Sequence, residues 1–395
     1  MRTSVAIVGG GVGGLSAALS LLAAGVDVRV YEQAPALREV GAGVQVSVNA
    51  SRVLHRLGLA DALAATGVKP LAWHQRRWDD GRTLLRAPLA EAVQAAYGFP
   101  HYQMHRADLL AALAAAFPAE RLHLGHRLTG LTDHGDRVEA RFANGARAEA
   151  DALVGADGIH SAVRGLLFGP ESPRFTGCVA YRALVPADRL RHLDLEVTGQ
   201  VWLGPGQHFV HYYVSARRLV NFVAVIERET WTAESWTDRG DPADALAAFA
   251  DWHPQVREII GAAGETFVWA LLDRAPLERW SVGRVTLLGD ACHAMLPFMA
   301  QGAAQAIEDG AALAACLREG PDVPAALRRY ERVRIPRTSR IQAMSAGNKI
   351  RYHLPDGPDQ RERDERMAAG SAAWSFNAVG WLYDYDAGDL NATPG

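Results

Sequence analysis

The chain has 395 residues, of which 49% are hydrophobic and 22% are charged, and its formal net charge is −3. This length predicts two to three domains of about 150 residues each, and the composition is that of a globular protein. The slight acidic excess argues against nucleic acid as a partner, and no apolar run approaches the roughly 18 residues that would suggest a membrane span. Three widely spaced cysteines indicate neither a disulfide framework nor a metal knuckle, and no signal-peptide pattern opens the chain, so we expect a cytoplasmic protein.

The N-terminal segment follows a strand–helix–strand pattern around a glycine motif. Its parts are the apolar run 5–8, the glycines Gly9, Gly11 and Gly14 in the spacing G-x-G-x-x-G, and a second strand over 26–31. A lone glycine motif also occurs in ordinary turns, but the strand before it, the helix after it and an acid after the second strand favour a dinucleotide site. Gly9 would permit the tight turn, Gly11 the approach of a diphosphate, and Gly14 the close packing of helix on strand. Glu32 would bind the ribose hydroxyls.

The middle of the chain differs from both ends. Strands rich in Val, Tyr, Phe and Trp are predicted over 178–185, 200–203, 208–215 and 219–227. A buried strand returns at 284–288, and helices are predicted over 302–317 and about 325–352. We therefore expect an α/β fold in which an antiparallel sheet is inserted into a Rossmann-like domain.

The expected organisation is a discontinuous Rossmann-like cofactor domain, an inserted substrate domain, and a C-terminal helical region with a tail. Their ranges are 1–70, 101–176 and 271–320 for the first, 71–100 and 177–270 for the second, and 321–395 for the third. The Arg-rich stretch 328–340 is interpreted as the solvated face of a packed helix, with Tyr330, Val333 and Met344 pointing inward.

Three motifs occur in order along the chain. They are the G-x-G-x-x-G motif, then Gly155-Ala156-Asp157-Gly158 with Ser161 and Arg164 behind it, and then Gly289-Asp290-Ala291-Cys292-His293 followed by Pro297 and Gln301-Gly302. Together they resemble the single-component FAD-dependent aromatic hydroxylases, the group built like para-hydroxybenzoate hydroxylase, over nearly the whole chain. The narrower similarity is to salicylate hydroxylase and 6-hydroxynicotinate 3-monooxygenase. It is carried by Gly41-Ala42-Gly43, Val179-Ala180-Tyr181-Arg182 and Met299-Ala300-Gln301-Gly302.

The resemblance implies that the Rossmann-like domain binds FAD. In it, Glu32 would hold the adenosine ribose, Arg106 would contact FAD, and Asp290 would bind the ribityl chain or the diphosphate. The amides of Gly302 and Ala303, at a helix N-terminus, would face the N1–C2=O edge of the flavin, which is anionic when reduced. Asp157 would serve FAD and the pyridine nucleotide, or alternatively would only fix a turn. The implied cofactor residues are Gly9, Gly11, Gly14, Glu32, Arg106, Asp157, Gly289, Asp290, Pro297, Gly302 and Ala303.

The resemblance also implies the reaction. NADH or NADPH reduces FAD, O2 adds to form a flavin C4a-hydroperoxide, and oxygen is transferred to a small electron-rich aromatic ring. A base that removes a phenolic proton accelerates the transfer, and the site must exclude water. His208 and Tyr212 lie four residues apart in a predicted strand and share one face, whereas His211 lies on the other. We expect His208 and Tyr212 to be the catalytic pair, with His211 as the alternative base; the competing interpretation is a strand whose aromatic residues only pack.

Gln45, Tyr181 and Phe298 are the expected substrate-binding residues. In the resemblance, 6-hydroxynicotinate 3-monooxygenase has histidines at the positions of Gln45 and Phe298 and a cysteine near Gly199, so its substrate does not carry over directly. A phenolic acid and a hydroxypyridine carboxylate both stay open, as do NADH or NADPH and a monomer or a homodimer. No metal is expected, because the His101–His105 pair lacks further ligands at metal-site spacing.

Three other functions are compatible with parts of the pattern. An FAD-dependent epoxidase or oxidoreductase acting on an isoprenoid or polyketide would share the FAD motifs. A simple NAD-binding dehydrogenase would leave Gly289-Asp290 unexplained. A non-catalytic flavin-binding sensor would hold FAD without turnover.

Overall fold

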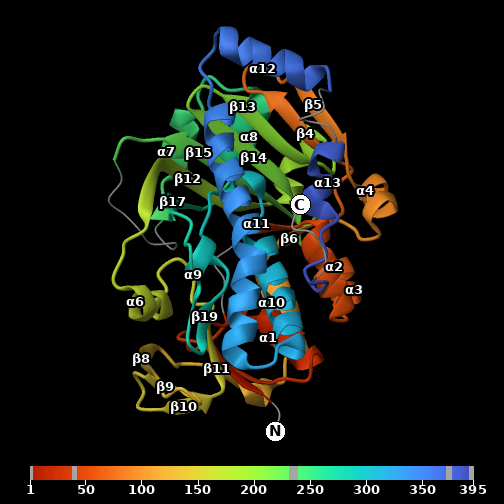
Figure 1. Cartoon of the computed structure of the whole chain (residues 1–395). Coiled ribbons are helices and arrows are strands. Elements are labelled where there is room, and N and C mark those ends of the chain that lie inside the picture. The colour runs from red at the N-terminus through yellow and green to blue at the C-terminus, as the bar shows by residue number, and fades with distance from the viewer. Residues whose placement is uncertain (1–2, 38–41, 231–238, 371–375, 391–395) are drawn as a thin grey trace.

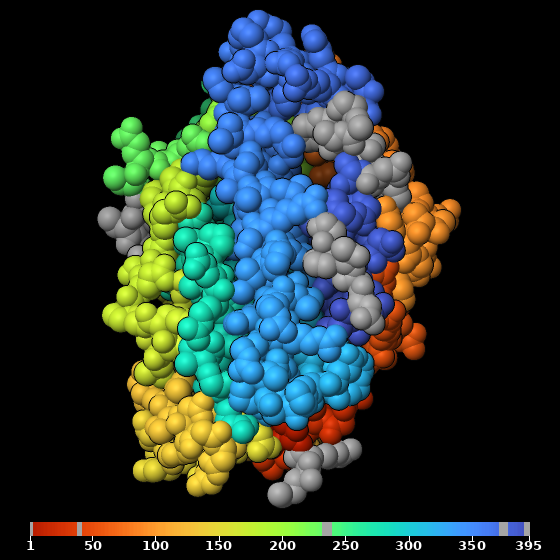
Figure 2. Space-filling view, viewed as in Figure 1, coloured from red at the N-terminus to blue at the C-terminus, as the bar shows by residue number. Residues whose placement is uncertain are grey.

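The computed structural model describes residues 3–37, 42–230, 239–370 and 376–390. Its two main sheets lie one above the other, and a long C-terminal helix runs alongside both of them (Figure 1). The same helix forms a band down the front of the molecule in the space-filling view (Figure 2). Residues 38–41, which include Gly41 of the Gly41-Ala42-Gly43 motif, lie outside the described part of the chain.

The lower sheet is built around the N-terminal apolar run. Its strands have the order β18-β19-β11-β1-β2-β7, and all neighbouring pairs are parallel except β18–β19. The bounds are β1 Ser4–Val8, β2 Asp27–Tyr31, β7 Leu122–His123, β11 Ala152–Gly155, β18 Ser281–Val282 and β19 Val285–Leu287. Since β1 pairs with β11 on one side and β2 on the other, the unbroken apolar run that the sequence shows is buried in the sheet centre.

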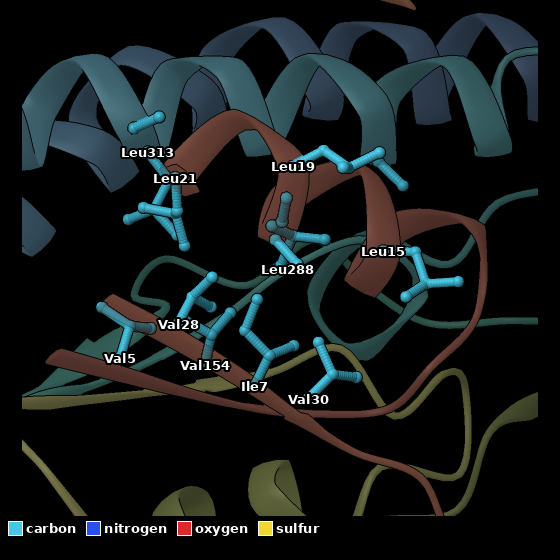
Figure 3. Packing of buried hydrophobic residues seen from close by; sticks show 14 of the residues in the cluster. Val5, Ile7, Leu15, Leu19, Leu21, Val28, Val30, Val154, Leu288 and Leu313 are labelled. Carbon is cyan, nitrogen blue, oxygen red and sulfur yellow. The ribbon is translucent and has the colours of Figure 1, made fainter. Parts of the chain in front are cut away.

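Helices cover one face of this sheet in two layers. Figure 3 shows the Leu and Val side chains that join the strands to α1 (Val12–Ala23), with α10 (Gly302–Glu319) stacked beyond it. Gly310 of α10 lies directly against α1, because a Cβ at Gly310 would come within 2.6 Å of the Ala17 Cα. Next to α10 lies α11 (Val323–Tyr352). A three-stranded sheet, β8 Leu128–Asp133, β9 Val138–Phe142 and β10 Arg147–Ala150, lies at the lower end of the molecule (Figure 1).

The upper sheet has eight strands in the order β16-β17-β12-β15-β14-β13-β4-β5. It is antiparallel, as expected, except that β13 and β4 pair in parallel. The bounds are β4 Ala72–Arg77, β5 Thr83–Pro88, β12 Arg174–Pro186, β13 Gly199–Gly204, β14 Gln207–Val214, β15 Leu219–Glu227, β16 Arg239–Gly240 and β17 Thr266–Asp273. The expected domain borders at 176/177 and 270/271 fall inside β12 and β17.

The two faces of the upper sheet have different neighbours. The outer face is the one that packs against α7 (Pro242–Ala248) and α8 (Pro254–Gly261) in a hydrophobic cluster. The inner face packs against residues 296–298, the end of α11 and α12 (Pro358–Ala368). Near its other end lies the small antiparallel pair β3 (Gly43–Val46) and β6 (Tyr102–His105).

The remaining helices are short. They are α2 Val48–Arg56, α3 Ala60–Thr66, α4 Ala90–Tyr97, α5 Arg106–Ala116, α6 Ala162–Phe168, α9 Asp290–His293 and α13 Gly380–Tyr383, together with the 3-10 turns η1 Ala119–Arg121, η2 Ala187–Leu193, η3 Pro297–Met299 and η5 Phe376–Val379. No helix in the described ranges has both the length and the apolar character that crossing a membrane requires.

Candidate functional site

A cleft of about 390 Å³ opens at the carboxyl ends of β1, β2, β11 and β19. Most of the predicted cofactor residues line it, although they come from positions far apart in the sequence. Those that do are Gly9, Gly11, Glu32, Arg106, Asp157, Gly289, Asp290, Gly302 and Ala303. Gly14 and Pro297 are not among the residues that line the cleft.

The glycines of the first motif have separate structural roles. Gly9 has a φ of +112°, which an L side chain rarely adopts. A Cβ at Gly14 would lie 1.9 Å from the Gly9 carbonyl oxygen, so Gly14 is needed for α1 to pack against the end of β1. A Cβ at Gly11 would meet nothing within 4 Å, which means that this position faces the open cleft.

Glu32 organises the turn after β2 as well as lining the cleft. Its carboxylate accepts hydrogen bonds from the backbone N–H of Gly10 at 2.6 Å and of Ala34 at 2.8 Å. Each carboxylate oxygen has a second lone pair, so both bonds leave room for ribose hydroxyls.

Two helices point their N-termini at the cleft. The N-cap residues are Gly11 for α1 and Gln301 for α10, and neither provides a side-chain hydrogen bond to its helix. The free N–H groups and the helix dipoles therefore favour an anionic ligand. Asp290 is exposed and follows Gly289, whose φ is +65°. It lies beside the N-terminus of α10, because a Cβ at Gly302 would be 3.8 Å from the Asp290 Oδ1.

Asp157 and Arg106 line the cleft and also hold the local fold. Asp157 accepts hydrogen bonds from the Ser161 hydroxyl at 2.5 Å and the Val163 N–H at 3.1 Å, and burial raises the pKa of Asp157. Arg106 begins α5 and donates its N–H to the Ala42 carbonyl at 2.8 Å. Pro297 is exposed at the start of η3.

These features fit an FAD molecule. Gly11 leaves open space where a diphosphate would approach, two uncapped helix N-termini supply positive partial charge, and Glu32 and Asp290 supply acceptors for hydroxyl groups. A Rossmann cleft with this donor set suits a dinucleotide, which the N-termini of α1 and α10 would help to hold.

The two predicted catalytic residues lie on the inner face of the upper sheet. The His208 ring stands edge-on against the Phe298 ring, with 4.8 Å between centroids. Tyr212 is near the other end of β14, where its hydroxyl would lie 2.5 Å from a Cβ at Gly43. The two backbone positions are four residue steps apart along the strand, or roughly 13 Å, and Val210 lies between them on the same face. His208 and Tyr212 therefore lie at the two ends of one strip of the sheet.

His211 and Tyr181 lie on the outer face. The nearest polar partner of His211 is Gln255 of α8, at 3.5 Å, and burial together with Arg76 and His74 lowers the pKa of His211 to about 3. Tyr181 is buried in the cluster beneath α7 and α8. Substrate contact by Tyr181, and His211 as an alternative base, do not fit these positions, because both side chains point away from residues 296–298 and β3.

Gln45 lies in a group of buried polar side chains on β3 and β6. Its Oε1 is 3.1 Å from His101 Nε2, and Gln103 is its neighbour across the pair of strands. Among the described residues, the side-chain amide of Gln103 and the Nδ2 of Asn221 have no hydrogen-bond partner. A Cβ at Gly199 would come within 2.5 Å of the Gln103 amide nitrogen, so glycine at this position is what admits Gln103.

His353 is a further residue at this site, and sequence reasoning did not identify it. His208 Nδ1 is 2.6 Å from His353 Nε2, and His353 Nδ1 is 2.9 Å from an oxygen of Glu227. His353 follows directly after the last residue of α11, so its contact with β14 depends on where a 30-residue helix ends. No local sequence signal marks it.

The Arg-rich stretch of α11 is solvated only in part: Arg328, Arg332 and Arg340 are exposed, as expected, but two other arginines are not. Arg334 and Arg337 are fully buried against Glu308 and Asp309 of α10. Tyr330 points inward as expected, whereas Met344 is 39% exposed, so that expectation for Met344 is wrong. The helix carries charge on its buried side because α10 supplies two carboxylates there.

Within the described ranges, two clusters have the composition of a metal site, namely Cys178 with Glu227 and His353, and Cys292 with His293 and Asp309. In the second, Asp309 is already bonded to Arg334 at 2.7 Å and to His293 at 2.6 Å. In the first, burial raises the pKa of the Cys178 thiol to about 11, and the Lys349 ammonium lies 4.0 Å from Glu227. Both sets are accounted for without an ion.

Comparison with known proteins agrees with this geometry. A family model described as FAD binding domain matches residues 2–345. The 3-amino-4-hydroxybenzoate 2-monooxygenase PtmB3 of Streptomyces platensis is 43% identical over 99% of this chain and 98% of its own length. The 6-hydroxynicotinate 3-monooxygenase of Pseudomonas fluorescens is 40% identical over 87% of this chain and 90% of its own. A salicylate hydroxylase substrate complex superposes with a TM-score of 0.84 at 28% identity, over 98% of this chain and 97% of that one.

The expected cofactor class and reaction class are therefore confirmed, and none of these relatives favours an isoprenoid oxidase, a simple dehydrogenase or a sensor. The chain belongs to the FAD binding domain family, as a flavoprotein monooxygenase that hydroxylates an aromatic ring with NAD(P)H and O2.

Proposed function

We propose that the substrate is a small aromatic ring bearing a hydroxyl and a carboxylate, held between the inner face of the upper sheet and the N-terminus of α10. His208 receives the hydroxyl proton, and Tyr212 positions the ring from the other end of β14. The proposal is supported by the relatives, whose names specify an aminohydroxybenzoate and a hydroxynicotinate as their substrates.

The observation that carries the proposal is the placement of His208. His208 is buried and lies beside Phe298. Phe298 in turn precedes the first residue of α10 by only four positions. Burial, and secondarily the neighbouring His353, holds the pKa of His208 well below its ordinary value, so the ring is neutral and able to accept a proton. Removing a phenolic proton makes the ring more electron-rich and hence more reactive toward an electrophilic oxygen.

FAD reduced by NAD(P)H supplies the activated oxygen. Glu32, the N-termini of α1 and α10, and Asp290 would hold it. The apolar side chains of Phe298, Val210 and Val223 keep water away from the ring. Among the described residues, the side-chain NH₂ groups of Gln103 and Asn221 have no hydrogen-bond partner, so they can donate to a substrate carboxylate. NAD(P)H use and three unpaired cysteines support a cytoplasmic location.

The test is NADH and NADPH oxidation with oxygen uptake by the FAD-loaded protein, across hydroxybenzoates, aminohydroxybenzoates and hydroxypyridine carboxylates. Product mass and peroxide yield are measured with each compound. We expect one hydroxylated carboxylate to stimulate oxidation strongly, with a product heavier by one oxygen atom and little peroxide. Stimulation by no compound of the panel would contradict the proposal.

A further inference from the structure

A continuous chain of hydrogen bonds leads from the inner face to the protein surface. It starts at His208 of β14, passes to His353 at the end of α11, and ends at Glu227, the last residue of β15. His208 and His353 are 2% and 5% exposed, whereas the Glu227 side chain is 45% exposed. Buried and solvated groups are thus joined through two imidazole rings.

The chemistry of the groups fixes the direction of these bonds. An ionised carboxylate only accepts, so His353 donates its Nδ1–H to Glu227. A neutral His353 then carries a lone pair on Nε2, and His208 must donate its own Nδ1–H to it. The remaining nitrogen of His208, Nε2, is therefore unprotonated and ready to accept a proton.

We propose that His353 and Glu227 relay the hydroxyl proton of the substrate from His208 to solvent, and return a proton at the end of turnover. This inference rests on the proposed role of His208. Because His353 and Glu227 act through His208 without touching the substrate, they are positioning residues.

Each transfer breaks one bond to hydrogen and forms another. The substrate O–H breaks as an N–H forms at His208 Nε2, and the Nδ1 proton of His208 moves to His353 Nε2. The Nδ1 proton of His353 moves to Glu227, which releases it to water. Both rings end neutral with their protons on Nε2, and a proton travelling inward to the product oxygen restores the starting tautomers.

The groups around His353 allow its ring to be protonated transiently but do not hold it as a permanent cation. Burial lowers the pKa of His353, while its hydrogen bond to Glu227 and the charge of that carboxylate oppose the shift. The C-terminus of α11 favours a cation at this position. Lys349 of α11 acts against it, and on β12 the Cys178 thiol, whose pKa burial raises to about 11, stays neutral. The rings of Phe298 and Tyr352 also pack edge-on against His208, with centroid distances of 4.8 Å and 5.3 Å.

The test measures proton release directly in the FAD-loaded protein. The probes are 3-amino-4-hydroxybenzoate and 6-hydroxynicotinate, mixed rapidly with the protein in weak buffer that contains a pH indicator dye. The variants are His353→Gln and Glu227→Gln, and the matched control is Glu229→Gln, at an exposed acid two residues further on. Glu227 is at the surface, so its variant should fold even if the His353 variant does not.

We expect proton release and hydroxylation to slow by about tenfold or more in His353→Gln, and by a smaller factor in Glu227→Gln, because proton transfer by a positioned group typically contributes about 10²–10⁴-fold. The pH profile of kcat should change in both variants, and added imidazole should restore part of the rate. Glu229→Gln should match the unmodified protein.

Unchanged proton release and an unchanged pH profile in both variants would overturn the relay while leaving the proposed function intact. A slower variant with an unchanged pH profile and no rescue by imidazole would also overturn it, because only structure would then have been lost. Absence of proton release and of stimulated NAD(P)H oxidation in the unmodified protein, with either probe or any compound of the panel, would instead count against the proposed function.

Discussion

Arg337 and Glu308 form a doubly hydrogen-bonded ion pair inside the molecule, with Nε–Oε2 at 2.8 Å and Nη2–Oε1 at 2.9 Å. Both side chains are fully buried, between α11 and α10. Glu308 also binds Arg334 at 2.5 Å and the Asn49 amide at 2.5 Å. The pair therefore fixes α10, the helix whose N-terminus faces the cleft, to α11 and to α2.

Replacing Glu308 should be strongly destabilising. Burial acts to raise the pKa of Glu308, but the charges of Arg334 and Arg337 hold it below its ordinary value. Glu308→Gln leaves two buried guanidinium groups with one carboxylate, which should cost about 3–5 kcal/mol of unfolding free energy. Thermal unfolding of the apoprotein measures the effect. Glu319→Gln, on the exposed end of α10, should change stability by less than about 0.5 kcal/mol, and equal losses in both variants would contradict the argument.

Gly11 and Gly14 should respond differently to the same substitution. Gly14→Ala places a Cβ 1.9 Å from a backbone oxygen and should lower the melting temperature of the apoprotein. Gly11→Ala places its Cβ in open space, so the apoprotein should keep its stability but bind FAD more weakly. Flavin fluorescence quenching and apoprotein unfolding separate the two effects. Full FAD affinity in Gly11→Ala would show that the diphosphate lies elsewhere.

The sequence predicts most of the cofactor cleft because those residues are tied to local geometry. Gly9 has the positive φ that only glycine adopts readily, and Glu32 follows a strand whose position is fixed by its apolar run. The period of two in a strand likewise predicts that His208 and Tyr212 share a face, as they do.

The two-residue alternation along a strand does not predict which face of the sheet is turned toward the cofactor. Tyr181 is an example. The strand is buried on both sides around Tyr181, and the packing of α7 and α8 determines which side is the outer face. Contacts between residues far apart in the chain cannot be predicted from local sequence patterns either. His208 contacts His353, 145 positions away, and Arg337 contacts Glu308, 29 positions away. Each requires the tertiary packing of α11, which local pattern does not encode.

Asp290 should be necessary for tight FAD binding. It is exposed in the cleft and begins α9, so its carboxylate is available to the cofactor rather than to the core. Asp290→Ala should weaken FAD binding by about 10- to 100-fold, the loss expected for hydrogen bonds to a charged group. The flavin content of the purified protein and a titration of the apoprotein measure this. Asp251→Ala, at an exposed position outside the residues that line the cleft, is the control, and full yellow colour in Asp290→Ala would contradict the role.

His208 and His211 provide a matched pair on one strand. His208→Gln should reduce hydroxylation by about 10²-fold or more, since a general base contributes that much, and should raise peroxide release per NAD(P)H consumed. His211→Gln, on the outer face, should keep the coupling of NAD(P)H oxidation to product. Product and peroxide are quantified together with the substrate found in the panel. Loss of coupling in His211→Gln alone would move the base to the other face.

Buried neutral histidines should make the fold sensitive to acid. Burial lowers the pKa of His101 from 6.5 to about 4. Between about pH 6.5 and pH 4, the unfolded chain therefore binds a proton at this histidine that the folded protein does not bind. The free energy of unfolding is thus highest above this pH range and decreases as the pH falls through it. At 1.36 kcal/mol per pKa unit, His101 alone contributes on the order of 3 kcal/mol to that loss. His101→Gln should thus be less stable than the unmodified protein at neutral pH, because its contact with Gln45 changes, yet lose less further stability on acidification. Melting temperatures measured from pH 8 to pH 4 for both proteins give the comparison, and parallel curves would show that His101 takes up its proton in the folded state.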